Sequence, residues 1–138
     1  MRILARAAAL VLLAASSAAW AIEFEPFPDS QITAAQWNAY YQDVAAAYGA
    51  SVRQLPDQHL VTFDDNAGGV HYAFTRPGHP AHPAWITRKI IQDPDGKLRI
   101  SQVGFFAGNE APFAELFREY QGLNDKILEE IRRGSNSK

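Results

Sequence analysis

The chain of 138 residues contains no cysteine. Disulfide bonds, thiol nucleophiles and thiolate metal sites are therefore excluded. It also contains no Gly-x-Ser-x-Gly, no His-Glu-x-x-His and no phosphate-binding glycine loop, so the common hydrolase, zinc-protease and nucleotide motifs are missing. The whole chain is 47% hydrophobic and 12% aromatic, and its length suits one globular domain.

The one long apolar stretch is at the N-terminus. Two arginines precede the apolar run 7–15, and Ala19-Trp20-Ala21 has the small-x-small pattern of a cleavage site. This arrangement indicates a secretory signal peptide, residues 1–21, cleaved before Ile22. The run is too short to favour a permanent membrane span. We therefore expect a soluble exported protein, periplasmic or secreted, with no stable membrane insertion after cleavage.

The charge balance argues against polyanionic partners. The formal net charge is −2, and it becomes −4 when the two signal-peptide arginines are removed. A mildly acidic domain with mixed signs is a poor binder of nucleic acid and of anionic membranes. We expect no nucleic-acid partner.

Hydrophobic periodicity predicts four elements after an extended lead-in at residues 22–30. Capping-box spacing at Thr33 and Gln36 begins a helix whose aromatic stripe ends near Tyr48. Period-two alternation then predicts a hairpin over 59–75 and a second over 85–106, each with turn residues at its tip. A second apolar stripe at helical spacing follows Asn109. The expected cross-strand pairs are Phe63–Val70, Val61–Tyr72 and His59–Phe74 in the first hairpin, and Ile90–Ile100 and Arg88–Gln102 in the second.

These elements predict an α+β fold in the order helix, β-hairpin, Pro-rich crossover, β-hairpin, helix. The four strands are expected to form one antiparallel sheet with both helices packed on one face. The single domain should span 31–133, followed by a flexible tail at 134–138. The uncovered face of the sheet would then expose Trp85, Val103 and Phe105.

The Pro-rich crossover has a repeated triplet. Residues 76–85, which we call the strap, read Arg-Pro-Gly-His-Pro-Ala-His-Pro-Ala-Trp. Each proline fixes φ and restricts the residue before it, which favours a polyproline II conformation with three residues per turn. In that conformation His79, His82 and Trp85 share one face.

Histidine and arginine are the residues in which chemistry could reside. All four histidines fall between residues 59 and 82. A polyproline II strap places His79 and His82 about 9 Å apart, so a zinc site would need both rings to lean inward and a third ligand such as His71. Arg88 lies among isoleucines in the predicted second hairpin. It must pair with an acid from a helix or bind an anion at the sheet edge.

The run from Phe74 to Pro83, followed by a two-stranded hairpin and a helix after Gly108-Asn109, resembles a group of small uncharacterised exported proteins of proteobacteria. The resemblance covers residues 70–125. It implies export and the fold described above, and it supplies no catalytic motif and no activity.

The sequence therefore favours a non-enzymatic binding or interaction module of the cell envelope without a cofactor. An inhibitor, an immunity-type protein and an accessory factor are the candidate roles, with another envelope or exported protein as partner. Rigid aromatic and arginine side chains are typical interface anchors. The predicted contact set is His79, His82, Trp85, Arg88 and Phe105. Two alternatives are a metal-binding protein or hydrolase using His71, His79 and His82, and a carrier of a small apolar ligand held between a helix stripe and the sheet.

Overall fold

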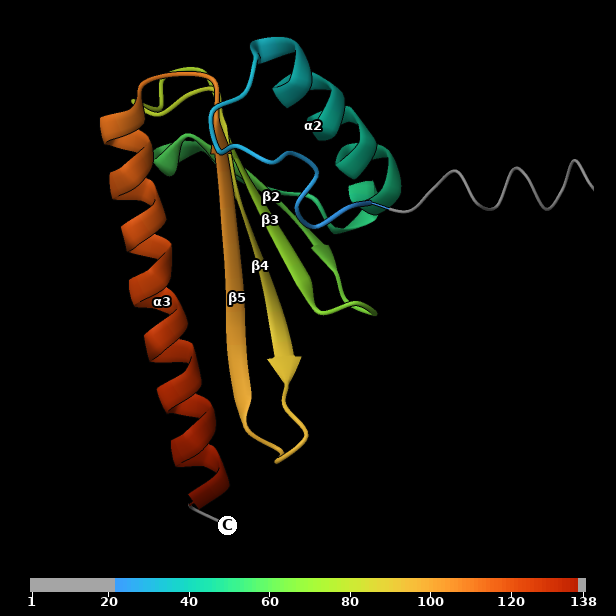
Figure 1. Cartoon of the computed structure of the whole chain (residues 1–138), viewed down its shortest axis with the longest axis vertical. Helices are drawn as coiled ribbons and strands as arrows, with labels where there is room; N and C mark the ends of the chain where they lie inside the picture. The colour runs from blue at the N-terminus through green and yellow to red at the C-terminus, as the bar shows by residue number, and fades with distance from the viewer. Residues whose placement is uncertain (1–21, 137–138) are drawn as a thin grey trace, which may run out of the picture.

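The computed structural model describes residues 22–136, so the predicted signal peptide, 1–21, lies outside the described residues. The elements are α2 (Ala34–Tyr48), η2 (Gly49–Ser51), β1 (Arg53–Leu55), η3 (Pro56–Gln58), β2 (Leu60–Asp65), β3 (Val70–Thr75), β4 (Ala84–Gln92), β5 (Leu98–Phe106) and α3 (Glu110–Asn136) (Figure 1). The strands form one antiparallel sheet in chain order. The α+β class is confirmed, with five strands instead of four. No helix within 22–136 is long and apolar enough to cross a membrane.

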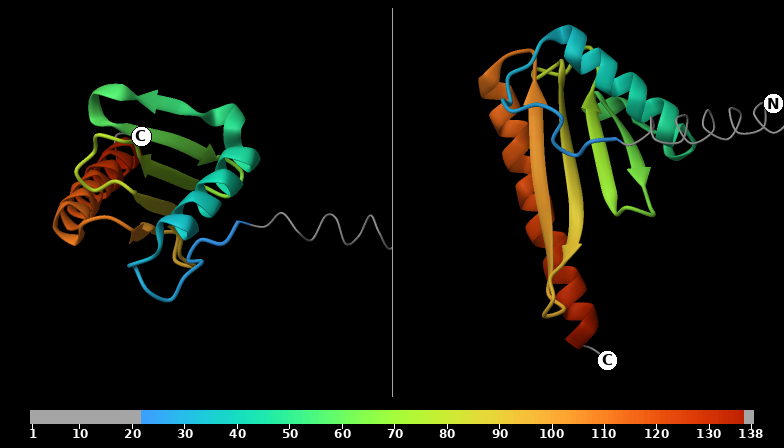
Figure 2. Two further views of the ribbon diagram at one scale, coloured as in Figure 1. Left: turned by 90° about the horizontal axis from the view of Figure 1, so that it is seen from above. Right: turned by 45° about the vertical axis from the view of Figure 1, so that its right-hand side comes forward.

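The two helices cover opposite faces of the sheet, as the view from above shows (Figure 2). Neighbouring residues of β4 demonstrate it: Trp85 packs with Tyr40 of α2, whereas Ile86 packs with Leu116 of α3. The prediction that both helices share one face is therefore wrong. Both faces of β4 are apolar near its start, and a strand that is apolar on both faces needs a cover on each.

Helix α2 begins as predicted. The Thr33 hydroxyl accepts a hydrogen bond from the amide of Gln36 at 3.1 Å, and the Gln36 side chain accepts one from the amide of Thr33 at 2.9 Å. The aromatic stripe of α2 then faces the sheet, where Tyr40 stacks on Trp85 with ring centroids 4.2 Å apart. The stripe is thus core, and the capping box fixes where it starts.

The first hairpin differs from the prediction in its register. The observed pairs are Phe63–Tyr72 and Val61–Phe74, a shift of two residues. The cause is a four-residue loop over 66–69, where Gly69 adopts a φ of +68° that favours glycine. Because side chains alternate with a period of two, this shift leaves the inward-facing residues inward.

Two further differences lie at the start of the sheet. Strand β1 was not predicted, because three residues ending before Pro56 are too few to show alternation; it pairs with β2 as an edge strand. His59 was expected in the first hairpin, as the cross-strand partner of Phe74. It instead follows η3 as an exposed residue with a φ of 53°.

The second hairpin has the predicted register, with Ile90 opposite Ile100 and Arg88 opposite Gln102. Its two strands have nine residues each, against six in β2 and β3, and they extend with α3 beyond the rest of the sheet (Figure 1). Helix α3 continues to Asn136, past the predicted domain end at residue 133. The far half of the hairpin is therefore covered by α3 on one face only.

The strap forms two consecutive turns rather than polyproline II. The amide of His79 donates to the carbonyl of Arg76, and the amide of His82 donates to the carbonyl of His79, each at 3.0 Å. A proline fixed near −65° fits the second position of a turn as well as polyproline II, and Gly78, with a φ of +105°, takes the third position of the first turn. The turns also give the two histidine amides an acceptor, which polyproline II would not.

Close backbone contact between the strap and the start of α3 leads to a prediction about two glycines. A Cβ at Gly108 would lie 2.6 Å from the carbonyl oxygen of His82, a rigid neighbour, whereas a Cβ at the helical Gly122 would meet nothing within 4 Å. We expect Gly108→Ala to lower the free energy of unfolding by about 1–3 kcal/mol through overpacking. The matched Gly122→Ala should raise it by about 0.5–1 kcal/mol. Urea unfolding of both variants checks the pair, and equal effects would contradict the contact.

Candidate functional site

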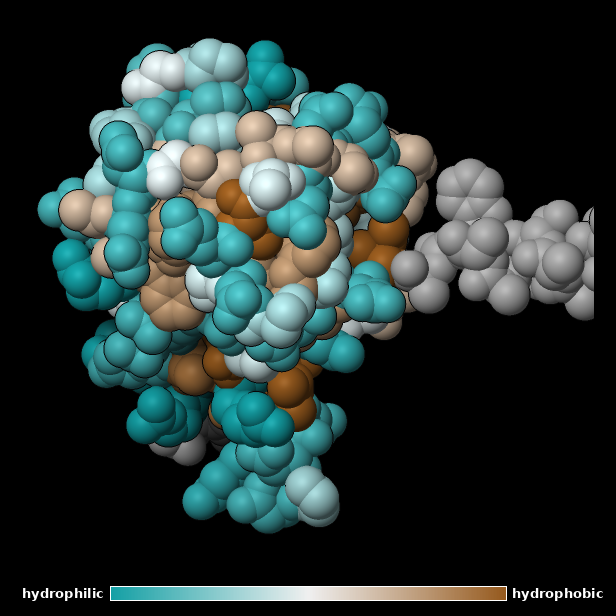
Figure 3. Space-filling model, turned by 45° about the horizontal axis from the view of Figure 1, so that its top comes forward, coloured by the Kyte–Doolittle hydropathy of each residue, from teal (hydrophilic) through white to brown (hydrophobic). Residues whose placement is uncertain are grey.

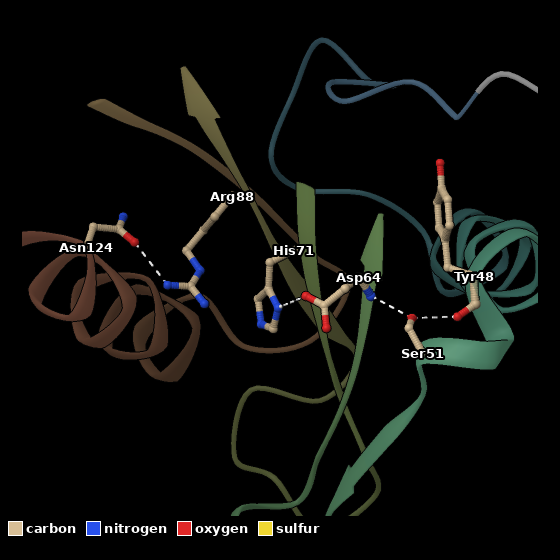
Figure 4. Close-up of polar contacts among 6 residues, drawn as sticks. All are labelled: Tyr48, Ser51, Asp64, His71, Arg88 and Asn124. Atoms are coloured by element: carbon tan, nitrogen blue, oxygen red, sulfur yellow. Dashed lines mark hydrogen bonds and ion pairs between the residues drawn. The ribbon is translucent and has the colours of Figure 1, made fainter. Parts of the chain in front are cut away.

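The sheet register aligns four polar residues on the face covered by α3. Asp64 lies opposite His71, His71 opposite Arg88, and Arg88 opposite Gln102. These four residues, one from each of β2 to β5, are called the polar row. Figure 4 shows His71 and Arg88 side by side, with Asp64 beyond His71 and Asn124 of α3 beyond Arg88. The row therefore crosses a face that is otherwise mainly apolar.

Helix α3 anchors one end of the polar row through an asparagine. Nη1 of Arg88 donates to Oδ1 of Asn124 at 3.1 Å, and Nδ2 of Asn124 donates to Oε1 of Gln102 at 2.8 Å. Gln102 in turn donates to the carbonyl of Phe117 at 2.9 Å. The guanidinium of Arg88 also lies 4.6 Å from the centre of the Tyr120 ring, a cation–π contact. The position of Arg88 is thus fixed from both the sheet and the helix.

Arg88 has no acidic partner within residues 22–136, where no carboxylate lies at ion-pair distance from it. The acid predicted from a helix is an amide, Asn124. Burial lowers the pKa of Arg88, although a guanidinium still remains protonated in a protein. Neither Nε nor Nη2 of Arg88 makes a hydrogen bond to a described residue. Nε is buried, whereas Nη2 is not. The guanidinium therefore has unused N–H donors, including those of Nη2, which is not fully buried.

His71 and Asp64 form a hydrogen-bonded pair next to this arginine, with Nδ1 and Oδ1 2.8 Å apart. Burial lowers the pKa of His71, against the opposing effect of the Asp64 carboxylate. In the neutral imidazole, Nδ1–H donates to Asp64 and the lone pair is on Nε2. Nε2 has no hydrogen bond to any described residue. The pair can therefore accept a proton or a hydrogen bond on its open side.

The other end of the polar row is tied to the turn after α2. The amide of Asp64 donates to the hydroxyl of Ser51 at 2.8 Å, and that hydroxyl donates to the carbonyl of Tyr48 at 2.7 Å (Figure 4). These two bonds hold the end of β2 against η2. The carboxylate facing His71 is therefore placed by the backbone and not by a flexible loop.

An open pocket of about 330 Å³ lies beside the row, between the tip of the β2–β3 hairpin and α3. His71 and Arg88 form part of its lining, and Ile90, Ile100 and Ile127 give it an apolar wall. Ile90 is 49% exposed, an unusual degree for an isoleucine in a strand. The pocket thus combines an unused guanidinium donor and an imidazole with a hydrophobic surface, a common composition of small-molecule sites.

Two residues of the predicted contact set are core residues. Trp85 is 0% exposed and Phe105 is 3% exposed, and Phe27 of the lead-in packs on both, 6.4 Å and 5.9 Å between ring centroids. The expectation of an exposed Trp85 and Phe105 patch is wrong, because α2 and the lead-in cover that face. Arg88 belongs to the opposite face, so the five predicted contact residues do not share one surface.

The strap histidines are used to hold the strap. Nδ1 of His79 accepts a hydrogen bond from the amide of Ala81 at 3.0 Å. Nδ1 of His82 bonds to the hydroxyl of Thr75 at 2.8 Å, and its ring lies edge-on to Trp37 at 5.2 Å. Burial lowers the pKa of both imidazoles. Their contacts are those expected of residues that fix a loop.

The three histidines of the metal alternative do not converge. His71 lies four strand residues from Thr75, the partner of His82, a distance of roughly 13 Å at ~3.3 Å per residue. Across residues 22–136, no group of three or more histidine, aspartate or glutamate side chains is placed to hold a metal ion. The arrangement gives the metal alternative no support.

Sequence reasoning singled out Arg88 but missed what surrounds it. The predicted register, with Phe63 opposite Val70, would place His71 opposite Thr62, so the two-residue error separated His71 from Asp64. Asn124 gave no signal, since a polar residue in an amphipathic helix is usually on the solvated side; here it is 7% exposed. A correct hairpin register would have revealed the polar row.

A scan of the chain against protein-family models gives no match, and searches of curated proteins and of solved structures give none either. The site is therefore interpreted from its own chemistry, a pocket that offers an unpaired guanidinium and an imidazole beside an isoleucine wall.

Proposed function

We propose that the protein is a non-enzymatic binding module of the cell envelope and that its ligand binds in the pocket beside Arg88. The observation that carries this proposal is the accessible Nη2 of Arg88, which has no partner among the described residues. The signal-peptide pattern of residues 1–21 supports the assignment to the envelope.

The energetics of Arg88 favour a role in binding over a role in stability. Arg88 is half-buried, so its guanidinium loses part of its hydration, and the cost of that loss is normally offset by a paired acid. Arg88 receives only one amide oxygen and one aromatic face. An apolar side chain of similar length would fill the same position between the isoleucines and α3 at less cost. An arginine at this position is best explained by an anionic group that arrives from outside.

The alternative of a small-ligand carrier fits this pocket better than a protein contact through the strap. Two of the predicted contact residues are buried, and both strap histidines are hydrogen-bonded. On the face shown in Figure 3, strongly hydrophobic residues appear as separate small areas among hydrophilic ones. Protein-docking surfaces are usually larger and continuous. The proposal therefore places the site in the pocket, with the ligand supplied as a small molecule or as the end of a partner chain.

The test is a ligand screen on the isotopically labelled protein, residues 22–138, by amide chemical shifts. The probes are simple carboxylates, phosphates, amines and sugars. We expect at least one class to shift the amides of Gly69, Val70 and His71 while those of His79 and His82 remain unchanged. Shifts confined to the strap, or none with any class at millimolar concentration, would refute the proposal.

A second hollow provides an internal control in the same spectra. It measures about 540 Å³ and lies between the β4–β5 turn and the last turns of α3, beside Leu98, Leu128 and Ile131. Its lining joins these apolar side chains with two cations, Lys97 and Arg132, and it contains no member of the polar row. Ligands that respond to any apolar surface or to any nearby cation should therefore shift the amides around both hollows. A ligand that recognises the polar row should shift only the amides around the pocket beside Arg88.

A further inference from the structure

We infer that the ligand of the Arg88 pocket is a carboxylate carried on a compact apolar chain of about ten non-hydrogen atoms. This inference rests on the proposed function and specifies the chemistry that the site selects. It follows from three features of the pocket: one accessible guanidinium nitrogen, a neighbouring imidazole, and an isoleucine wall.

The guanidinium favours a planar oxyanion over other charged groups. Arginine matches carboxylate and phosphate geometry with parallel N–H donors. Here, however, one N–H of Nη1 is held by Asn124 and Nε is buried, so the two N–H groups of Nη2 are the donors placed to meet a ligand. A dianionic phosphate would bring two negative charges beside Asp64 and Asp65, where a monoanion meets less repulsion. A monoanion with one oxygen on Nη2 suits the site better.

His71 supplies the second contact to the carboxylate and makes the affinity depend on pH. The charged or titratable groups that face it are Arg53 of β1, Asp64 of β2, Arg88 of β4 and Tyr120 of α3. Protonated His71 would donate Nδ1–H to Asp64 and Nε2–H to the second oxygen of the carboxylate. The anion favours the protonated form, so its binding should draw a proton onto His71 even though burial disfavours that charge in the free protein.

The aspartates near the pocket do not make it a site for cations. Asp64 is hydrogen-bonded to His71, and Asp65 accepts hydrogen bonds from the hydroxyl of Tyr48 and from the amide of Gly68. A cationic ligand would have to displace these partners and would be repelled by Arg88. The groups of the site that lack a partner are N–H donors of the Arg88 cation, and these favour an anion.

The wall and the volume indicate the chemistry and size of the part of the ligand that the open pocket holds. Ile90, Ile100 and Ile127 can cover an aliphatic chain but offer no side-chain hydrogen bond. A pocket of about 330 Å³ corresponds to roughly eleven water volumes at ~30 Å³ each. A medium-chain fatty acid fills this space, and so does the last apolar residue of a peptide with its free carboxylate. The two sources share one chemistry, and the experiment separates them.

The experiment is titration calorimetry on the folded protein with matched ligand pairs. Octanoate is compared with octanol, and acetyl-Ala-Ala-Ile as the free acid is compared with the same peptide as its amide. We expect the acid of at least one pair to bind about tenfold or more tightly than its uncharged partner, as for the loss of one charge-assisted hydrogen bond. Preference for octanoate assigns a free acid, and preference for the peptide acid assigns a chain terminus.

Charge variants locate the contact. Arg88→Gln should weaken binding of the preferred acid by about tenfold or more, while Arg88→Lys should retain part of it. The control, Arg99→Gln, removes a cation that pairs with Asp93 and is 56% exposed on the same hairpin. It should change affinity by less than about twofold, because exposed charges are screened. Equal weakening by both variants would overturn the assignment to Arg88.

The pH dependence tests the role of His71. Between pH 7.5 and 5.5 the affinity for the acid should rise as pH falls, by at most about tenfold per pH unit for uptake of one proton. His71→Gln should abolish this slope, because glutamine can still bond to Asp64 but does not titrate. A slope that persists in His71→Gln would overturn the role of His71. If acids and uncharged partners bind alike but still shift the pocket amides, the carboxylate inference fails while the proposed function remains.

Discussion

Replacing Trp85 with alanine is expected to lower the free energy of unfolding by about 3–5 kcal/mol. The indole is completely buried and stacks on Tyr40 with centroids 4.2 Å apart, while Phe105 lies 4.9 Å away. The ring therefore joins α2, the sheet and the lead-in, and its removal leaves a cavity bordered by rigid aromatic neighbours that cannot collapse into it. Urea unfolding followed by circular dichroism measures the loss.

A phenylalanine at the same position is the matched control. Nε1 of Trp85 has no hydrogen bond to any described residue, so Trp85→Phe removes volume and no hydrogen bond. We expect a cost of about 1–2 kcal/mol, well below that of alanine. If Trp85→Ala instead changes stability by less than about 0.5 kcal/mol, as exposed positions do, the indole is at the surface and the observed packing of α2 is contradicted.

The error about Trp85 shows which part of the fold local sequence cannot determine. The sequence correctly predicts that both faces of β4 carry apolar residues, but not what covers each face. The cover over Trp85 depends on contacts far apart in the chain. Ile32 donates a backbone hydrogen bond to Phe106 at 2.9 Å, and Phe106 donates one to Ser30 at 2.9 Å. These bonds place the lead-in, and hence α2, on the face opposite α3, and no periodic pattern encodes them.

Features with a local cause were predicted correctly. Thr33 and Gln36, which form the capping box, are three residues apart in the sequence. The register of the second hairpin is fixed by a turn at Pro94-Asp95, followed by Gly96 at a φ of +86°. The first hairpin has no proline in its turn. Two adjacent glycines, Gly68 and Gly69, then allow several loop lengths, which is why the predicted register was off by two.

The candidate site shows the consequence of that single error. Arg88 was identified from its apolar surroundings alone, and its pairing with Gln102 was correct. The two-residue shift, however, moved His71 from Thr62 to Asp64 and so created the row of Asp64, His71 and Arg88. A shift by two residues keeps every side chain on the same face of the sheet, so the hydrophobic core is unchanged. It does change which residues lie opposite each other. The polar row therefore forms in one register only.

The same polar layer gives the second large expected effect. Asn124→Leu should lower the free energy of unfolding by about 3 kcal/mol, because it leaves the guanidinium of Arg88 without its acceptor and Oε1 of Gln102 without its donor. Arg88→Met removes the half-buried cation itself and leaves only Oδ1 of Asn124 without a donor, so we expect a cost of about 1 kcal/mol.

The variant that combines Arg88→Met with Asn124→Leu tests whether Arg88 serves the stability of the fold or the binding of a ligand. This variant lacks both the guanidinium and the Asn124 amide that accepts its hydrogen bond. The free energy of unfolding should therefore fall by about 2 kcal/mol, less than the sum of the two single effects. Purely additive costs would mean that Arg88 and Asn124 do not interact. A cost of 3–5 kcal/mol for Arg88→Met alone, as when a buried pair is broken, would make Arg88 a structural residue and remove the main support for the pocket as a binding site. A small cost together with lost carboxylate binding would mean that this cation is maintained for its ligand, since the fold is nearly as stable without it.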